Sequence, residues 1–194
     1  MGRFMPKGKE WVIIVNLPNK LTILRMVLIV PFVICMLVPG LGDAGMYASV
    51  ALFVAASLTD LLDGKIARRY NLVTNFGKFM DPLADKLLVS AALICLTAQG
   101  RLAAWISIII ISREFIISGF RLVASDNGIV IAASYWGKFK TTFQMIMIVM
   151  LILNYGNEAY QVCATIITYV ALLLTLISLF DYIAKNKDVL KEQK

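Results

Sequence analysis

The segment AGMYASVALFVAASLTDLLDGKIARRYNLVTNFGKFMDPLAD, residues 44–85, contains the pattern that determines how this chain folds. It begins with an apolar run, residues 44–59, that has no charged side chain, and four aspartates follow within residues 60–85. Such a run is typical of a helix in a lipid bilayer, which needs about 20 mostly apolar residues. Lipid does not tolerate ionised side chains facing it. We therefore expect the aspartates to lie at helix ends that face a protected cavity.

The same apolar pattern recurs along the whole chain. Its residues are 60% hydrophobic and only 16% charged, whereas about a quarter of the residues of a soluble domain are charged. The mean hydropathy of +0.80 agrees with a membrane protein. We predict an all-α, polytopic membrane protein with six transmembrane helices and three segments: an extension (1–15), a six-helix domain (16–184) and a basic tail (185–194). The other charge-free runs are 26–42, 87–100, 102–112, 141–157 and 159–180.

Basic residues fall almost entirely on one predicted side of the membrane. Arg101 is the only one on the other side, and cytoplasmic segments are enriched in Lys and Arg. We therefore expect both termini and the acidic helix ends on the cytoplasmic face of the cell membrane, which requires an even number of spans. The net charge of +7 then favours anionic lipid headgroups, and we predict no nucleic-acid partner.

The four aspartates form two pairs at helical spacing. Asp60 and Asp63 are separated by three residues, and Asp81 and Asp85 by four, so each pair shares one helix face. Carboxylates that converge in this way raise one another's pKa unless cations are present. Ligation by oxygen alone suits Mg²⁺ or Mn²⁺, and two such ions balance four aspartates. The small residues on these faces are Gly64, Ala67 and Gly77.

Other kinds of site are less well supported. The chain has no histidine, which excludes an imidazole base or metal ligand, and Cys35, Cys95 and Cys163 lie in separate apolar runs without zinc-site spacing. The aspartates could instead form ordinary ion pairs with neighbouring Lys and Arg. Such pairs would not need Gly and Ala at fixed helical offsets.

A second cluster, of basic residues, follows the fourth apolar run. It consists of Arg113, Arg121, Lys138 and Lys140, which could bind a phosphate group or could act only as cytoplasmic anchors. Arg113 at membrane depth favours binding, and Glu114 would orient it. Near the N-terminus, Asn19 is predicted to be a helix N-cap.

The order Asp-x-x-Asp-Gly-x-x-Ala-Arg, eight residues, Gly-x-x-x-Asp-x-x-x-Asp resembles the signature of the CDP-alcohol phosphotransferases. The resemblance implies a six-span homodimer that transfers a phosphatidyl group from a CDP-activated lipid. It also implies that Asp60, Asp63, Asp81 and Asp85 bind two metal ions and that Asp85 is the catalytic base. The CDP-lipid would contact Thr22, Arg25, Asp60, Gly64, Ala67, Arg68 and Gly77.

Three further segments resemble the bacterial branch of this family that joins CDP-diacylglycerol to glycerol 3-phosphate. They are residues 16–25, 113–121 and 137–141. Other acceptors (inositol phosphate, serine or phosphatidylglycerol) remain open, as does a divalent-cation transporter with aspartates along its path. Because related chains often begin near Asn16, we expect Val15 to be the natural first residue.

Overall fold

In the computed structural model, the described residues are 17–69, 75–126 and 134–186, and all the regular secondary structure within them is helical. Six α-helices correspond to the six apolar runs, and each extends past its run into charged residues. The element bounds are α1 Leu17–Leu37, η1 Pro39–Leu41, α2 Gly42–Arg69, α3 Asn75–Ala98, α4 Ala104–Asp126, α5 Tyr135–Leu153 and α6 Glu158–Lys185, with η1 a short 3₁₀ helix.

The start of α1 differs from the prediction. Leu17 is already helical, so Asn19 lies inside the first turn and the prediction that it is the N-cap was wrong. Pro18 can occupy such a position because the first N–H groups of a helix need no intrahelical partner. Thr22 and Arg25 therefore lie in the second and third turns of α1.

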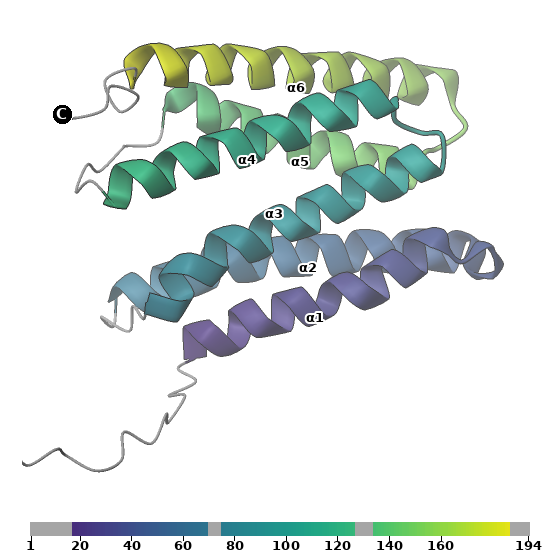
Figure 1. Cartoon of the computed structure of the whole chain (residues 1–194). Coiled ribbons are helices and arrows are strands. Elements are labelled where there is room, and N and C mark those ends of the chain that lie inside the picture. The colour runs from purple at the N-terminus through teal and green to yellow at the C-terminus, as the bar shows by residue number, and fades with distance from the viewer. Residues whose placement is uncertain (1–16, 70–74, 127–133, 187–194) are drawn as a thin grey trace, which may run out of the picture.

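The helices form two groups that meet along α2, α3 and α5. Helices α1, α2 and α3 pack against one another, α6 packs against α4 and α5, and α3 contacts both α4 and α5 (Figure 1). Because successive helices alternate in direction, the start of α1 and the end of α6 lie at the same end of the bundle. We call this the charged end. It also holds the end of α2 and the start of α3, which carry the four aspartates.

The core is apolar and rich in small residues. Phe32 of α1 packs against Phe53 of α2 with ring centroids 6.0 Å apart, and Leu93 of α3 and Ile148 of α5 are fully buried nearby. Small residues allow helix backbones to approach closely within a membrane. The buried alanines of the described helices are Ala56, Ala84, Ala92, Ala124, Ala164 and Ala171.

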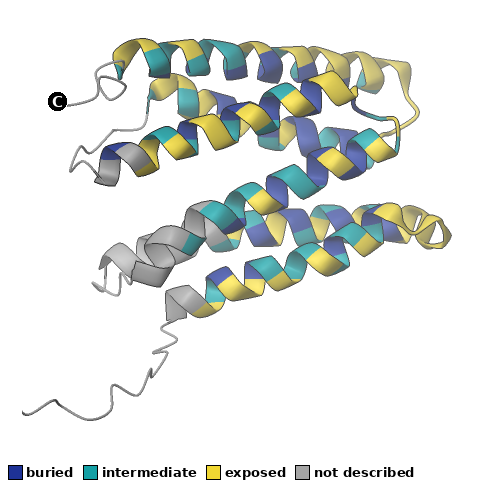
Figure 2. Cartoon of the chain, in the orientation of Figure 1, coloured by how far each residue is buried: buried dark blue, intermediate teal, exposed yellow. Residues whose placement is uncertain are grey.

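The outward faces of the helices are apolar as well. Figure 2 shows exposed positions along the outside of the bundle, and they include Val30 of α1, Ile108 of α4 and Leu173 of α6. A soluble protein rarely exposes so many large apolar side chains, so this surface supports a membrane protein. Four described segments are long and apolar enough to cross a membrane: Lys20–Leu37, Pro39–Thr59, Tyr135–Leu153 and Glu158–Lys185. Six spans therefore remains a prediction, because α3 and α4 contain several charged residues.

Opposite the charged end, the connections are tight and are held by Arg101. Its guanidinium donates hydrogen bonds to the carbonyl oxygens of Leu151 (3.3 Å) and Ile152 (2.8 Å), which belong to the last turn of α5. The last carbonyls of a helix have no intrahelical donor, and a cation there is favourable. Gly100 has a φ of 69°, which suits glycine and allows the short turn between α3 and α4.

Candidate active site

The two aspartate pairs lie on two packed helices at the charged end. Helix α2 continues without interruption through Asp60 and Asp63, and α3 contains Asp81 and Asp85, so both spacings are helical as predicted. Of the four side chains, that of Asp85 is described. The side chains of the other predicted metal and CDP-lipid residues at these helix ends lie outside the described residues: Asp60, Asp63, Gly64, Ala67, Arg68, Gly77 and Asp81.

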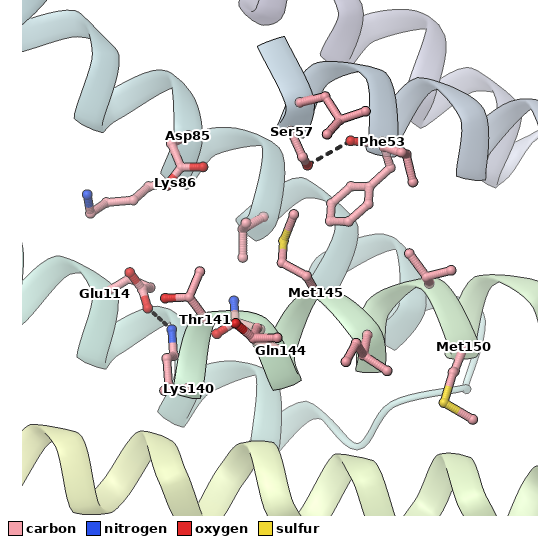
Figure 3. Close-up of a pocket in the computed structure, with 16 residues that line it drawn as sticks. Phe53, Ser57, Asp85, Lys86, Glu114, Lys140, Thr141, Gln144, Met145 and Met150 are labelled. Carbon is pink, nitrogen blue, oxygen red and sulfur yellow. Dashed lines mark hydrogen bonds and ion pairs between the residues drawn. The ribbon is translucent and has the colours of Figure 1, made fainter. Parts of the chain in front are cut away.

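Asp85 lies on the wall of a cavity of about 620 Å³ between the two groups of helices. The cavity is lined by residues of α2, α3, α4 and α5. Figure 3 shows Asp85 and Lys86 on one side, facing Glu114 and Lys140 on the other. The apolar part of the wall consists of Phe53, Val54, Leu58, Val89, Met145, Ile146, Val149 and Met150. The cavity is therefore charged toward one end and apolar along the rest of its length.

A buried network of charged and polar side chains joins α4, α5 and α6 beside this cavity. Arg113 donates a hydrogen bond to the Glu114 carboxylate (3.2 Å) and another to the Ser178 hydroxyl (2.8 Å). Lys140 also pairs with Glu114, which therefore holds two cations. Arg113 is 8% exposed and Lys140 is 2% exposed. Buried ions need such partners because burial removes their hydration.

The structure thus divides the four basic residues predicted to bind the acceptor phosphate. It brings Arg113 and Lys140 together through Glu114. It places Arg121 and Lys138 against aromatic rings instead: the Arg121 guanidinium carbon is 5.9 Å from the centre of the Tyr182 ring, and the Lys138 ammonium is 5.3 Å from that of Tyr135. Both are cation–π contacts. Of these four residues, Lys140 lines the cavity, whereas Arg113, Arg121 and Lys138 do not.

Thr22 and Arg25 are both fully buried on α1. They are one turn apart, so they lie on one face of the helix, and α1 packs against α2 and α3. A fully buried arginine needs a partner, because its charge cannot be solvated there. This placement suits a role near the aspartate-bearing ends of those helices.

Sequence reasoning missed two residues of this region. Ser178 is a small polar residue inside the apolar α6 and accepts the hydrogen bond from Arg113. Gln144 lines the cavity one turn after Lys140 and is 3% exposed. The signal for Gln144 was present, since it is a single polar amide in an otherwise apolar stretch, residues 143–153. Serine in a membrane helix is too common to have singled out Ser178.

The residues of the charged end fit divalent cations by their chemistry. Both helix ends offer carboxylates, which are hard oxygen donors, and the chain has no histidine. Hard donors of this type suit Mg²⁺ or Mn²⁺ better than zinc or copper. Since α2 packs against α3, the two pairs belong to neighbouring helices at the same end of the bundle.

Comparison with known proteins gives consistent matches along most of the chain. A family model described as CDP-alcohol phosphatidyltransferase matches residues 15–177. The CDP-diacylglycerol--glycerol-3-phosphate 3-phosphatidyltransferase of Bacillus subtilis is 46% identical over 190 residues, covering 91% of this chain and 97% of that protein. The Haemophilus influenzae protein of the same name is 40% identical, covering 89% and 94%. A probable phosphatidylglycerophosphate synthase of Mycobacterium tuberculosis is 38% identical, covering 89% and 82%.

Proposed function

This chain belongs to the CDP-alcohol phosphatidyltransferase family, and from that premise we propose that it transfers the phosphatidyl group of CDP-diacylglycerol to sn-glycerol 3-phosphate. The products are phosphatidylglycerophosphate and CMP. Relatives in Bacillus subtilis and Haemophilus influenzae are named for this activity. The alignments cover 97% and 94% of these two relatives, which supports the same reaction for this chain.

The observation that carries the proposal is the cavity between α2, α3 and α5. Asp85, Glu114 and Lys140 lie toward its charged end, and apolar side chains such as Val54 and Met150 line the rest. CDP-diacylglycerol has the same division, with acyl chains attached to a strongly charged headgroup. An apolar wall continuous with a charged one therefore suits a lipid whose headgroup reacts.

Metal ions complete the charged end. We assign two divalent ions, Mg²⁺ or Mn²⁺, to Asp60, Asp63, Asp81 and Asp85, which matches the charge of four carboxylates. Members of this family generally use divalent metal. When bound, such ions neutralise the carboxylates and stabilise the negative charge that develops on phosphoryl oxygens.

The protein's own residues then handle the proton and the substrates. An oxygen of the Asp85 carboxylate accepts the proton of the acceptor's C1 hydroxyl. That hydroxyl oxygen bonds to the lipid-side phosphorus, the bond from this phosphorus to the bridging oxygen breaks, and CMP leaves with the electron pair. On the nucleotide side, Thr22, Arg25 and Arg68 bind the diphosphate, and Gly64, Ala67 and Gly77 leave room for the cytidine.

Arg113 and Lys140 are the cations that we assign to the phosphate of glycerol 3-phosphate. Both now share the Glu114 carboxylate, so their charges are already gathered at one point beside the cavity. A phosphate can accept hydrogen bonds from an arginine fork and a lysine together. We propose Arg121 and Lys138 as weaker phosphate ligands, because each contacts an aromatic ring in this structure.

For the molecule as a whole, we propose six spans, cytoplasmic termini and a cytoplasmic active site in a homodimer. The basic residues at the charged end support this orientation. A cation transporter is disfavoured, since the relatives described above have transferase names and the aspartate pairs lie at one end of the bundle.

The proposal is tested by CMP release from the purified chain with CDP-diacylglycerol, Mg²⁺ and a panel of acceptors. We expect release with glycerol 3-phosphate and loss of release when the metal is chelated. Serine, inositol phosphate and phosphatidylglycerol should each support much slower release. Equal activity with serine or phosphatidylglycerol would contradict the assignment of a phosphate-binding pocket to this cavity.

A further inference from the structure

Gln144 is a buried polar residue in the wall of the cavity. It lies on α5 four residues after Lys140, so both side chains project from the same face of that helix. The residue is 3% exposed, and the residues that directly precede and follow it, Phe143 and Met145, are apolar. Its amide is uncharged, so it adds no positive charge for phosphate binding, and it cannot take the place of Asp85 in proton transfer.

The Gln144 amide is also incompletely satisfied. Among the described residues, its buried Oε1 oxygen has no hydrogen-bond partner. Figure 3 shows the amide nitrogen pointing into the cavity, toward the side that holds Asp85. Buried polar groups normally have a partner, because leaving one unpaired costs stability. A molecule bound in the cavity would meet the amide nitrogen, which can donate a hydrogen bond to it.

We propose that Gln144 binds the C2 hydroxyl of glycerol 3-phosphate and so helps to select this acceptor. The inference rests on the proposed function. In that scheme the acceptor's phosphate meets Lys140 and its C1 hydroxyl meets Asp85, which leaves the C2 hydroxyl between them. Gln144 lies on the cavity wall beside Lys140. A hydroxyl oxygen can accept a hydrogen bond from the amide nitrogen that faces the cavity.

The test compares two acceptors in the full-length protein reconstituted in phospholipid. One is glycerol 3-phosphate and the other is 3-hydroxypropyl phosphate, which has the same phosphate and reacting hydroxyl but lacks the C2 hydroxyl. We expect the wild type to prefer glycerol 3-phosphate in kcat/KM by about tenfold, the effect of one hydrogen bond to a buried amide. Gln144→Met retains the length of the side chain without the amide and should bring this preference close to one.

Two further variants support the comparison. Gln144→Asn keeps an amide but withdraws it by one methylene, and it should also lose most of the preference. Gln161→Met is the matched control, because the exposed side chain of Gln161 on α6 donates hydrogen bonds to Asn154 and Tyr155, away from the cavity wall. It should retain the full preference.

The outcomes separate this inference from the proposed function. A wild type that shows no preference, or Gln144 variants that keep it, would overturn the role of Gln144 while glycerol 3-phosphate activity stands. Equal loss with both acceptors would mean that Gln144 serves only packing, and would also overturn it. If the wild type were inactive with both acceptors, the proposed function itself would be contradicted.

Discussion

At the scale of single residues, the charge balance beside the cavity centres on Glu114. This one carboxylate holds the ammonium of Lys140 and the guanidinium of Arg113, and all three groups are largely buried. Moving an ion out of water costs several kcal/mol, so each cation depends on a nearby anion. A substrate phosphate can serve as a second anion for both. Two cations share one carboxylate, so the three groups carry a net charge of +1 that a bound phosphate would offset.

Replacing Lys140 by methionine should weaken acceptor binding selectively. Lys140→Met keeps a long unbranched side chain but removes the positive charge. We therefore expect the KM for glycerol 3-phosphate to rise by the equivalent of about 2 kcal/mol. The KM for CDP-diacylglycerol should change little. Initial rates at varied concentrations of each substrate measure both.

Lys138→Met is the informative comparison, because Lys138 is exposed on the same helix and contacts Tyr135. Its effect on the KM for glycerol 3-phosphate should be clearly smaller. Equal effects at the two positions would mean that the buried lysine has no special role in acceptor binding.

Asp85→Asn should nearly abolish turnover. The amide has a similar shape but cannot accept the hydroxyl proton, and general-base catalysis contributes at least about 100-fold to rate. We expect kcat to fall by that factor or more, while thermal unfolding in detergent stays close to that of the wild type. Asp43→Asn, at the exposed start of α2 on the opposite end, is the control and should retain activity. Substantial activity in Asp85→Asn would remove this residue as the base.

The sequence predicted local spacing better than contacts between helices. The pairs Asp60 with Asp63 and Asp81 with Asp85 follow from the helical repeat alone, and the helices contain them as expected. The contact between Lys140 and Glu114 joins residues 26 apart in the chain. Nothing in either local segment indicates that α4 and α5 meet at these positions, so this network was visible only in the structure.

At the scale of elements, α2 is the most consequential helix. It runs from Gly42 to Arg69 without a break and links an apolar segment directly to Asp60 and Asp63. The rotation of the apolar segment against α1 therefore fixes the direction in which these aspartates face. The predicted apolar run ended at Thr59, and the structure shows that the helix continues for ten more residues. Helix ends are set by packing and by the chain beyond them, which composition does not report.

Inserting one alanine after Thr59 should disable the enzyme through geometry alone. With 3.6 residues per turn, the insertion rotates Asp60 and Asp63 by about 100° relative to the rest of α2. We expect activity to fall by at least about 100-fold, as for loss of a catalytic group, with helix content by circular dichroism unchanged.

An alanine inserted after Gly156, in the connection between α5 and α6, is the matched control. It should leave activity near the wild-type level, because that connection lies opposite the charged end. Full activity after the α2 insertion would show that catalysis does not depend on the direction in which Asp60 and Asp63 point.

For the whole molecule, the six apolar runs predicted six helices that all cross the membrane, and the described residues contain six α-helices. Four described segments are long and apolar enough to cross a membrane, whereas charged residues interrupt the apolar stretches of α3 and α4. Those charges include Asp85, Arg113 and Glu114, which face the bundle interior. A helix that buries its charged residues against its neighbours can still cross the bilayer, so we expect α3 and α4 to be spans as well.

Orientation can be tested by cysteine labelling. In a background with Cys35, Cys95 and Cys163 replaced by alanine, Ala103→Cys lies before α4 and Lys185→Cys lies at the end of α6, at opposite ends of the bundle. We expect a membrane-impermeant maleimide to label Ala103→Cys in intact cells, and Lys185→Cys only after the cells are opened, because basic residues favour the cytoplasm. The reverse pattern would place the active site outside.

The central claim is that the C1 hydroxyl oxygen of glycerol 3-phosphate attacks the lipid-side phosphorus of CDP-diacylglycerol. Its most direct test uses glycerol 3-phosphate labelled with ¹⁸O in that hydroxyl, followed by mass spectrometry of both products. The account predicts ¹⁸O in phosphatidylglycerophosphate and none in CMP. Phosphatidic acid together with an ¹⁸O-labelled CMP ester of glycerol 3-phosphate would show attack on the nucleotide-side phosphorus and would contradict the account.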